Sequence, residues 1–101
     1  MIKYQFHYDN DEIKKIVVKG HALFSDYGND IVCAAVSTAV IVTINAITKL
    51  NLKNNIKYEI KDGYLELEVI KKDKIVNSLL DNLLYSLNDL SNDYPSHLMK
   101  I

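Results

Sequence analysis

Apolar and polar residues alternate over residues 2–8, at the start of the chain. Alternation puts the apolar side chains on one face of an extended chain, so this stretch predicts a half-buried strand. The four polar residues 9–12 predict a turn, and residues 13–19 are expected to pair back as the second strand of a hairpin.

The same alternation returns at 56–60 and at 65–69, on either side of Asp62-Gly63. An Asp-Gly pair between alternating stretches favours a two-residue hairpin turn, because such turns need positive φ at both central residues. We therefore expect a second β-hairpin in this part of the chain.

Two longer segments have patterns typical of helices. Residues 31–50 are apolar nearly all round and predict a central, buried helix, with Asp30 as its N-cap. Apolar residues recur at helical spacing over 73–92 and predict a second helix, which ends before Pro95. Residues 96–101 could add a last edge strand.

The predicted order is ββαββα with a possible C-terminal strand. Hairpins alternating with helices predict an α+β fold, in which an antiparallel sheet carries both helices on one face. A length of 101 residues, 49% of them hydrophobic, suits one domain over residues 1–101.

The charged residues argue against nucleic acid as a direct partner. The chain has twelve lysines, no arginine and a formal net charge of -1. Bidentate recognition of phosphate and guanine is arginine chemistry, so RNA binding is disfavoured.

The compartment follows from the cysteine count and from the apolar segments. A single cysteine allows no internal disulfide, and residues 1–8 lack the apolar core of a signal peptide. Residues 31–50 match a bilayer span in length, but serine, threonine and asparagine interrupt them. We therefore expect a cytoplasmic protein with no membrane segment.

No motif points to a metal or a cofactor. Zinc sites need paired cysteines or closely spaced histidines, and phosphate-binding loops need glycine-rich motifs that this sequence lacks. The pair Asp26 and Asp30 is a weak signal for a cation. The remaining candidates for a catalytic site are the loop expected at 20–29 and the start of the helix that follows it.

Cys33 falls in the first turn of the expected helix, where free backbone N–H groups favour a thiolate and can donate to an oxyanion. His21 lies at the other end of the loop, and the freedom of Gly20 and Gly28 would let the loop fold back so that the imidazole takes the thiol proton. The residues alone leave a second interpretation open, in which Cys33 belongs to the core and His21 is solvated.

Other polar residues near this point have competing roles. Ser37 lies one helical turn after Cys33, and its hydroxyl either bonds the carbonyl four residues back, which we favour, or holds the thiol or substrate. Asp30 is a helix cap or an acid beside the thiolate. His7, on the polar side of its strand, and His97, in the tail, are expected on the surface.

The residues around Cys33 resemble a known family, the ribosomal-processing cysteine proteases called Prp. The family signature is a GHA element followed by G-x-D-[IL]-V-C-A-x-V-S. The matching positions are Gly20-His21-Ala22, Phe24, the segment 28–37, Asn45-Ala46-Ile47 and Tyr94-Pro95. Two departures are mild: Ser25 stands where relatives often carry Ala, and Ala35 where many carry Gly.

The resemblance implies an activity and a site. The family's catalytic cysteine falls on Cys33 and its histidine on His21, while Asp30 matches a family Asp that is either a cap or an orienting acid. Members are small α+β homodimers that remove a short N-terminal extension from a large-subunit ribosomal protein, the twenty-seventh in the usual count. The implied partner is therefore a ribosomal protein precursor.

We expect a cysteine endopeptidase that uses no cofactor. Gly20, Ala22, Phe24 and Gly28 belong to a mobile substrate loop, and substrate binding is expected to order residues 22–29. The alternative is a non-catalytic binding module for a ribosomal protein or its precursor, in which Cys33 is inert.

Overall fold

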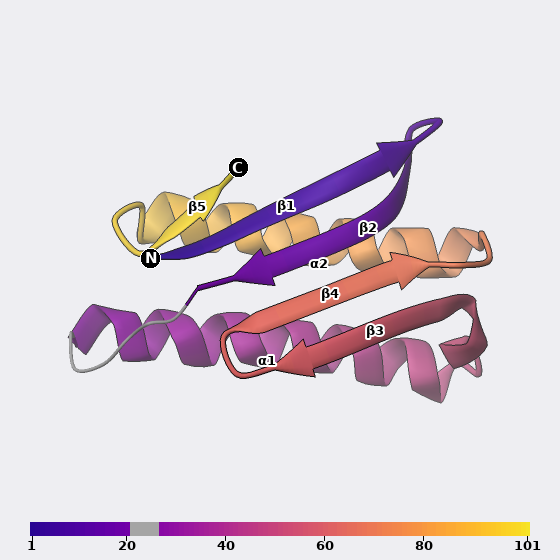
Figure 1. Cartoon of the computed structure of the whole chain (residues 1–101), viewed down its shortest axis with the longest axis horizontal. Helices are drawn as coiled ribbons and strands as arrows, with labels where there is room; N and C mark the ends of the chain where they lie inside the picture. Colours follow the sequence, from indigo (N-terminus) through magenta and orange to yellow (C-terminus); the bar gives the residue numbers. More distant parts are fainter. Residues whose placement is uncertain (21–26) are drawn as a thin grey trace.

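The structure is a computed structural model that describes residues 1–20 and 27–101, with side chains described for 1–20 and 31–101. Two hairpins alternate with two helices, as the sequence pattern predicts (Figure 1). The elements in chain order are β1 (Ile2–Asp9), β2 (Glu12–Lys19), α1 (Tyr27–Lys49), the short 3-10 helix η1 (Lys53–Asn55), β3 (Ile56–Lys61), β4 (Tyr64–Val69), α2 (Lys74–Asp93) and β5 (Leu98–Lys100).

The described strands form one sheet in the order β3-β4-β2-β1-β5, with both helices on the same face (Figure 1). All neighbours are antiparallel except β1 and β5, which pair in parallel with Ile2 opposite Leu98. The sheet is therefore mixed, and the expectation of a purely antiparallel sheet is wrong. The reason is α2, whose 20 residues span roughly 30 Å and return the chain to the end of the sheet where β1 begins.

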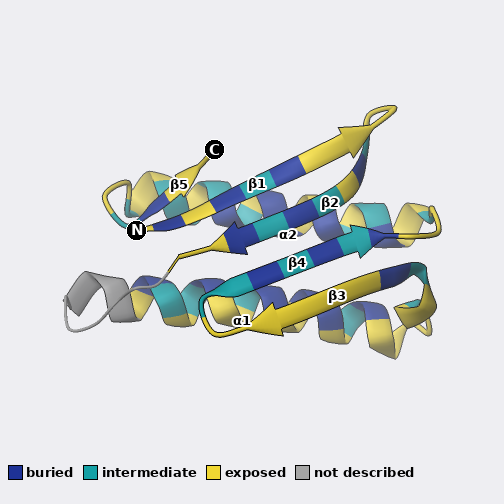
Figure 2. Ribbon diagram, in the orientation of Figure 1, coloured by how far each residue is buried: buried dark blue, intermediate teal, exposed yellow. Residues whose placement is uncertain are grey.

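The core lies between the sheet and the helices, and the alternation along the strands explains its composition. The buried side chains of the core cluster include Tyr4, Ile16 and Leu67 of the strands, together with Ile47 of α1 and Leu80 of α2. Figure 2 shows that buried positions recur along the strands and along both helices. The other face of the sheet is open and carries charged side chains such as the ion pair between Lys15 Nζ and Glu66 Oε1, at 3.0 Å.

The second helix begins as predicted, and the first does not. The carboxylate of Asp73 caps α2 by accepting from the backbone N–H groups of Ile75 and Val76, at 2.8 and 3.0 Å. Helix α1 begins at Tyr27, so Asp30 lies inside the first turn and the prediction that it is the N-cap is wrong. No proline stops α1 from extending back to Tyr27, and an acidic residue suits a first turn electrostatically as well as a cap.

Helix α1 is less buried than its apolar sequence predicts. Away from the pocket it exposes Ile31 and Val42, which are 49% and 60% accessible. A two-layer fold covers only one side of each helix, so an all-round apolar helix keeps an apolar outer face. Residues Ile31–Lys49 are long and apolar enough to cross a membrane, and 28% of that window is buried inside the protein.

Candidate active site

Cys33 lies on the side of α1 that faces the sheet, where it is partly exposed and packs against the core. It is six residues beyond Tyr27, so it lies in the second turn, roughly 9 Å along the axis from the start of the helix. The prediction of a first-turn position is wrong. The free N–H groups of the helix are those of its first four residues, so the N–H of Cys33 is not among them.

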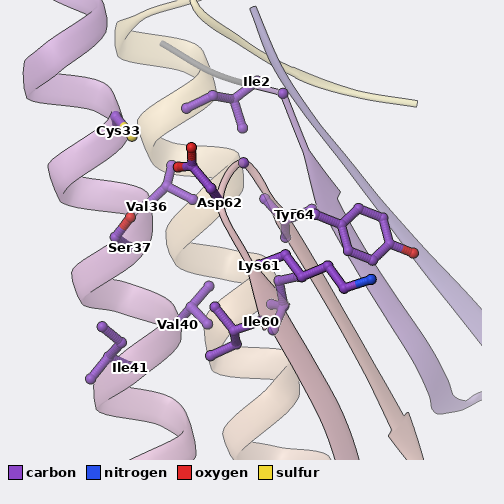
Figure 3. Close-up of a pocket in the computed structure, with 14 residues that line it drawn as sticks. Ile2, Cys33, Val36, Ser37, Val40, Ile41, Ile60, Lys61, Asp62 and Tyr64 are labelled. Atoms are coloured by element: carbon purple, nitrogen blue, oxygen red, sulfur yellow. The ribbon is translucent and has the colours of Figure 1, made fainter. Parts of the chain in front are cut away.

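A pocket of about 230 Å³ opens beside Cys33, between α1 and the β3–β4 hairpin. Figure 3 shows Cys33 and Ser37 of α1 on one wall and the hairpin with Asp62 on the other. The remaining walls are mostly apolar, with Val36 and Val40 from α1 among them. The pocket therefore offers a thiol, a hydroxyl and a carboxylate in a mostly apolar setting.

Ser37 shares this pocket with Cys33, one helical turn away. Within the described part of the chain its hydroxyl has no hydrogen-bond partner, whereas Thr43 and Thr48 bond back to the carbonyls of Ala39 and Ile44, at 2.8 and 3.0 Å. The predicted bond from Ser37 to the carbonyl four residues back is not formed. The other role that we considered for Ser37, contact with the thiol or the substrate, is compatible with its place in the pocket.

Gly20 lines the pocket and is held in place. Its backbone N–H donates to the carbonyl oxygen of Gly63 at 3.0 Å, and its φ of +108° is a conformation that other residues rarely adopt. A Cβ atom at this position would lie 2.3 Å from the carbonyl oxygen of Met1. The end of β2 is thus fixed both to the hairpin turn and to the start of β1.

Several predicted site residues fall outside the described structure. His21, Ala22 and Phe24 lie in the segment that is not described, so the predicted Cys33–His21 pair has no measured geometry. Gly28 lies within α1, so the loop prediction for 20–29 is wrong for its last three residues.

Neither of the two other histidines is among the residues that line the pocket. His7 is exposed and projects from β1 with Lys3 and Gln5, on the open side of the sheet, as predicted. His97 is half-buried rather than exposed, and its carbonyl oxygen accepts from the backbone N–H of Ile2 at 2.9 Å as the chain enters β5. Among the described residues, no three histidine, cysteine or acidic side chains gather as a metal site would require.

Sequence reasoning missed the hairpin as a wall of the site. Asp62 and Gly63 are predicted only as a turn, yet they lie across the pocket from Cys33. Tyr64 also lines the pocket, but its ring points away from Cys33, and its hydroxyl donates to Glu66 Oε2 at 2.7 Å (Figure 3). That hydrogen bond raises the pKa of Tyr64 and lowers the pKa of Glu66, which Lys15 lowers further.

The family is settled by comparison with known proteins. Residues 1–99 match the family described as cysteine protease Prp. The chain belongs to the Prp family of cysteine proteases. The predicted family, fold class and enzyme class are therefore confirmed, and the protease is favoured over the binding module.

Proteins similar in sequence and in structure agree with this family assignment. The ribosomal processing cysteine protease Prp of Staphylococcus aureus is 27% identical over 92 residues, which are 89% of this chain and 87% of that protein. The crystal structure of S. aureus Prp with a substrate peptide has a TM-score of 0.88 at 22% identity, over 100% of this chain and 98% of that one. A Streptococcus mutans structure has a TM-score of 0.80 at 26% identity, over 99% and 91%.

Proposed function

We propose that this Prp-family protease removes the N-terminal extension of a large-subunit ribosomal protein, the twenty-seventh, with Cys33 as nucleophile and His21 as base. One observation carries the assignment of the nucleophile: the chain contains a single cysteine, and that cysteine lines a pocket. A cysteine protease with one thiol has one possible nucleophile.

The choice of His21 as base rests on chain connectivity. His7 projects from the open side of the sheet, away from the helices, and His97 lies at the entry to β5. His21 follows Gly20, which lines the same pocket as Cys33. His21 is the next residue in the sequence after Gly20, and this adjacency in sequence supports its choice as the base.

The reaction runs in two steps. His21 accepts the thiol proton, and the thiolate of Cys33 attacks the scissile carbonyl carbon to form a tetrahedral intermediate. The C–N bond then breaks, His21 returns its proton to the leaving amine, and water hydrolyses the thioester that remains. The Ser37 hydroxyl is placed to donate to a substrate oxygen in the pocket.

The substrate is proposed from the family. A protein substrate agrees with the S. aureus relative, which is named as a ribosomal processing protease and whose structures carry a substrate peptide or a covalently linked product peptide. The specific ribosomal protein follows from the resemblance at residues 20–37.

The test is incubation of the purified precursor with the wild type, Cys33→Ala and His21→Ala. The wild type is expected to release the extension, and both variants are expected to lose cleavage. His7→Ala is the matched control, because it removes a histidine from the opposite face and should cleave as the wild type does. Cleavage by Cys33→Ala would overturn the assignment.

We also propose that the protein acts in the cytoplasm as a homodimer. The exposed Ile31 and Val42 give α1 apolar surface that a second copy would cover. Sedimentation should show a dimer that Val42→Glu converts to a monomer, whereas Tyr85→Glu, on exposed α2 surface, should not. Recovery of the protein in the soluble fraction without detergent tests the compartment.

A further inference from the structure

The strand β3 lies at the end of the sheet and pairs on one side only. Among the described strands its neighbour is β4, in an antiparallel register that sets Tyr58 opposite Leu67 and Ile60 opposite Leu65. In an antiparallel ladder, successive residues direct their backbone N–H and C=O groups alternately toward the partner strand and away from it. Every second residue of β3 therefore offers a donor and an acceptor to a further strand.

The hydrogen bonds at the start of β3 show which residues these are. The carbonyl oxygen of Asn55, just before β3, accepts from the backbone N–H of Ile70, just after β4, at 2.9 Å. The N–H of Ile56, the next residue, bonds back into η1 instead of to β4. Continued alternation turns the backbone groups of Tyr58 and Ile60 away from β4. Within the described part of the chain, no strand lies on that side to pair with them.

The same residues turn their side chains toward the helices. Side chains of a strand alternate between its two faces, and Ile56, on the face shared with Ile60, is buried in the core. Ile60 is 54% exposed and lines the pocket of Cys33 together with Ile41 of α1, which is 51% exposed. Figure 3 shows Ile60 turned toward α1, beside Val40. Free backbone groups and uncovered apolar side chains therefore occur together along this side of the pocket.

This row of free groups leads to the thiol. The strand β3 runs toward the turn at Asp62-Gly63, and the pocket lies between that hairpin and the part of α1 that carries Cys33. Ile60 itself lines the pocket, so a chain that pairs beside Ile60 has already reached it. Tyr58 lies two residues further back, roughly 7 Å along the strand. An extended chain along β3 is thus continuous with the pocket in which a cysteine protease must receive its peptide bond.

We propose that an extended segment of the polypeptide substrate binds as an added strand on β3, beside Tyr58 and Ile60, with an apolar side chain against Ile41 and Ile60. Main-chain hydrogen bonds then hold the segment whatever its sequence, and the pocket selects the side chain that faces α1. The inference rests on the proposed function, because it takes the ribosomal protein precursor as the source of the segment.

The first measurement follows the exchange of backbone amide hydrogens with water by NMR, in Cys33→Ala with and without the purified precursor. This variant lacks the nucleophile, so the complex persists. Binding is expected to slow exchange at Tyr58 and Ile60 by about tenfold or more, because both amides gain a partner. The amide of Glu59, which the alternation directs to β4, is the internal reference and should not change. Unchanged exchange at Tyr58 and Ile60 in the saturated complex overturns the proposal.

Cleavage kinetics test the same donor in the chain that keeps Cys33. Ile60→Pro removes the outward N–H, and an edge strand accepts proline at such a position. We expect KM to rise at least about fivefold relative to Ile60→Ala, which loses the side chain but keeps the N–H. Lys100→Pro is the matched control on β5, because the N–H of Ile101 bonds to Tyr4 and that of Lys100 therefore points outward. Lys100→Pro should cleave as the wild type does. Equal KM values for Ile60→Pro and Ile60→Ala overturn the proposal, and the exchange measurement decides alone if Ile60→Pro does not fold.

These outcomes separate the strand pairing from the proposed function. If the wild type does not cleave the precursor, or if Cys33→Ala does, the proposed function fails and the segment proposed for β3 fails with it. If cleavage depends on Cys33 while Tyr58 and Ile60 exchange as before, only the strand pairing is lost. Exchange at these two amides that slows with protein concentration, without precursor, assigns the edge of β3 to a second copy and also overturns the proposal.

Discussion

The backbone N–H of Gly20 donates to the carbonyl oxygen of Gly63, at 3.0 Å, and thereby joins the end of β2 to the tip of the β3–β4 hairpin. This bond links two segments that are more than forty positions apart in the sequence. Both glycines line the pocket, so the bond holds two parts of the pocket wall together.

Replacing Gly20 with alanine should destabilise the protein. The φ of +108° costs a residue with a Cβ about 1–2 kcal/mol, and the contact with the carbonyl oxygen of Met1 adds to that cost. Urea unfolding followed by circular dichroism should show a lower midpoint for Gly20→Ala. Gly63→Asn is the control, because asparagine tolerates the φ of +71° found there. Equal midpoints for Gly20→Ala and the wild type would contradict the prediction.

Removing the Ser37 hydroxyl should reduce activity and leave stability unchanged. The hydroxyl makes no hydrogen bond within the described structure and faces the pocket beside Cys33, so its loss removes a donor to substrate and no contact of the fold. We expect Ser37→Ala to lower kcat/KM by at least about tenfold, with the same free energy of unfolding. Thr38→Ala, at the neighbouring exposed position, should match the wild type in both measurements. A drop in unfolding free energy for Ser37→Ala would instead assign the hydroxyl a structural role.

The stability of the protein should fall at alkaline pH because of Tyr4. Burial raises the pKa of this phenol above its ordinary value of 10.0, since the ionised form would lose hydration. A raised pKa in the folded state stabilises the fold below the unfolded value, and that contribution is lost as pH rises through the folded value. The unfolding free energy should therefore decrease above about pH 10.

Two variants isolate this effect. Tyr4→Phe loses the hydrogen bond from the hydroxyl to Asn88 Oδ1, at 2.5 Å, and should be about 1 kcal/mol less stable near neutral pH. Its stability should then depend less on alkaline pH than that of the wild type. Tyr85→Phe, at an exposed position of α2, should keep the alkaline loss. If Tyr4→Phe and the wild type lose stability in parallel, Tyr4 is not the titrating group.

Local patterns in the sequence predict the strands and most of the helix positions. Alternation at 56–60 and 65–69 around Asp62-Gly63 gives β3 and β4 nearly to the residue, because a hairpin is decided by its own side chains and turn. The N-terminal limit of α1 is missed, because Asp30 suits both a cap and a first turn. The parallel pairing of β5 with β1 depends on where α2 delivers the chain, which no local pattern contains.

The site, like the fold, has a part that local sequence patterns predict and a part that only the folded chain reveals. A dense motif identifies Cys33 as the candidate nucleophile, and its place in a pocket agrees with that role. Asp62 has no motif around it that suggests chemistry, and only the folding of the hairpin over α1 brings it opposite Cys33. Residues that meet across a fold leave little trace in a single sequence.

The outer position of β3 has a consequence for handling the protein in concentrated solution. With a net charge of only -1, long-range repulsion between copies is weak. β3 is an edge strand of the sheet, and it carries the charged residues Lys57, Glu59 and Lys61. Charged side chains on an edge strand discourage a second copy from pairing with it edge to edge. Chemical acetylation of Lys57 and Lys61 would remove their positive charges from the edge strand and favour edge-to-edge pairing of copies into fibrous assemblies.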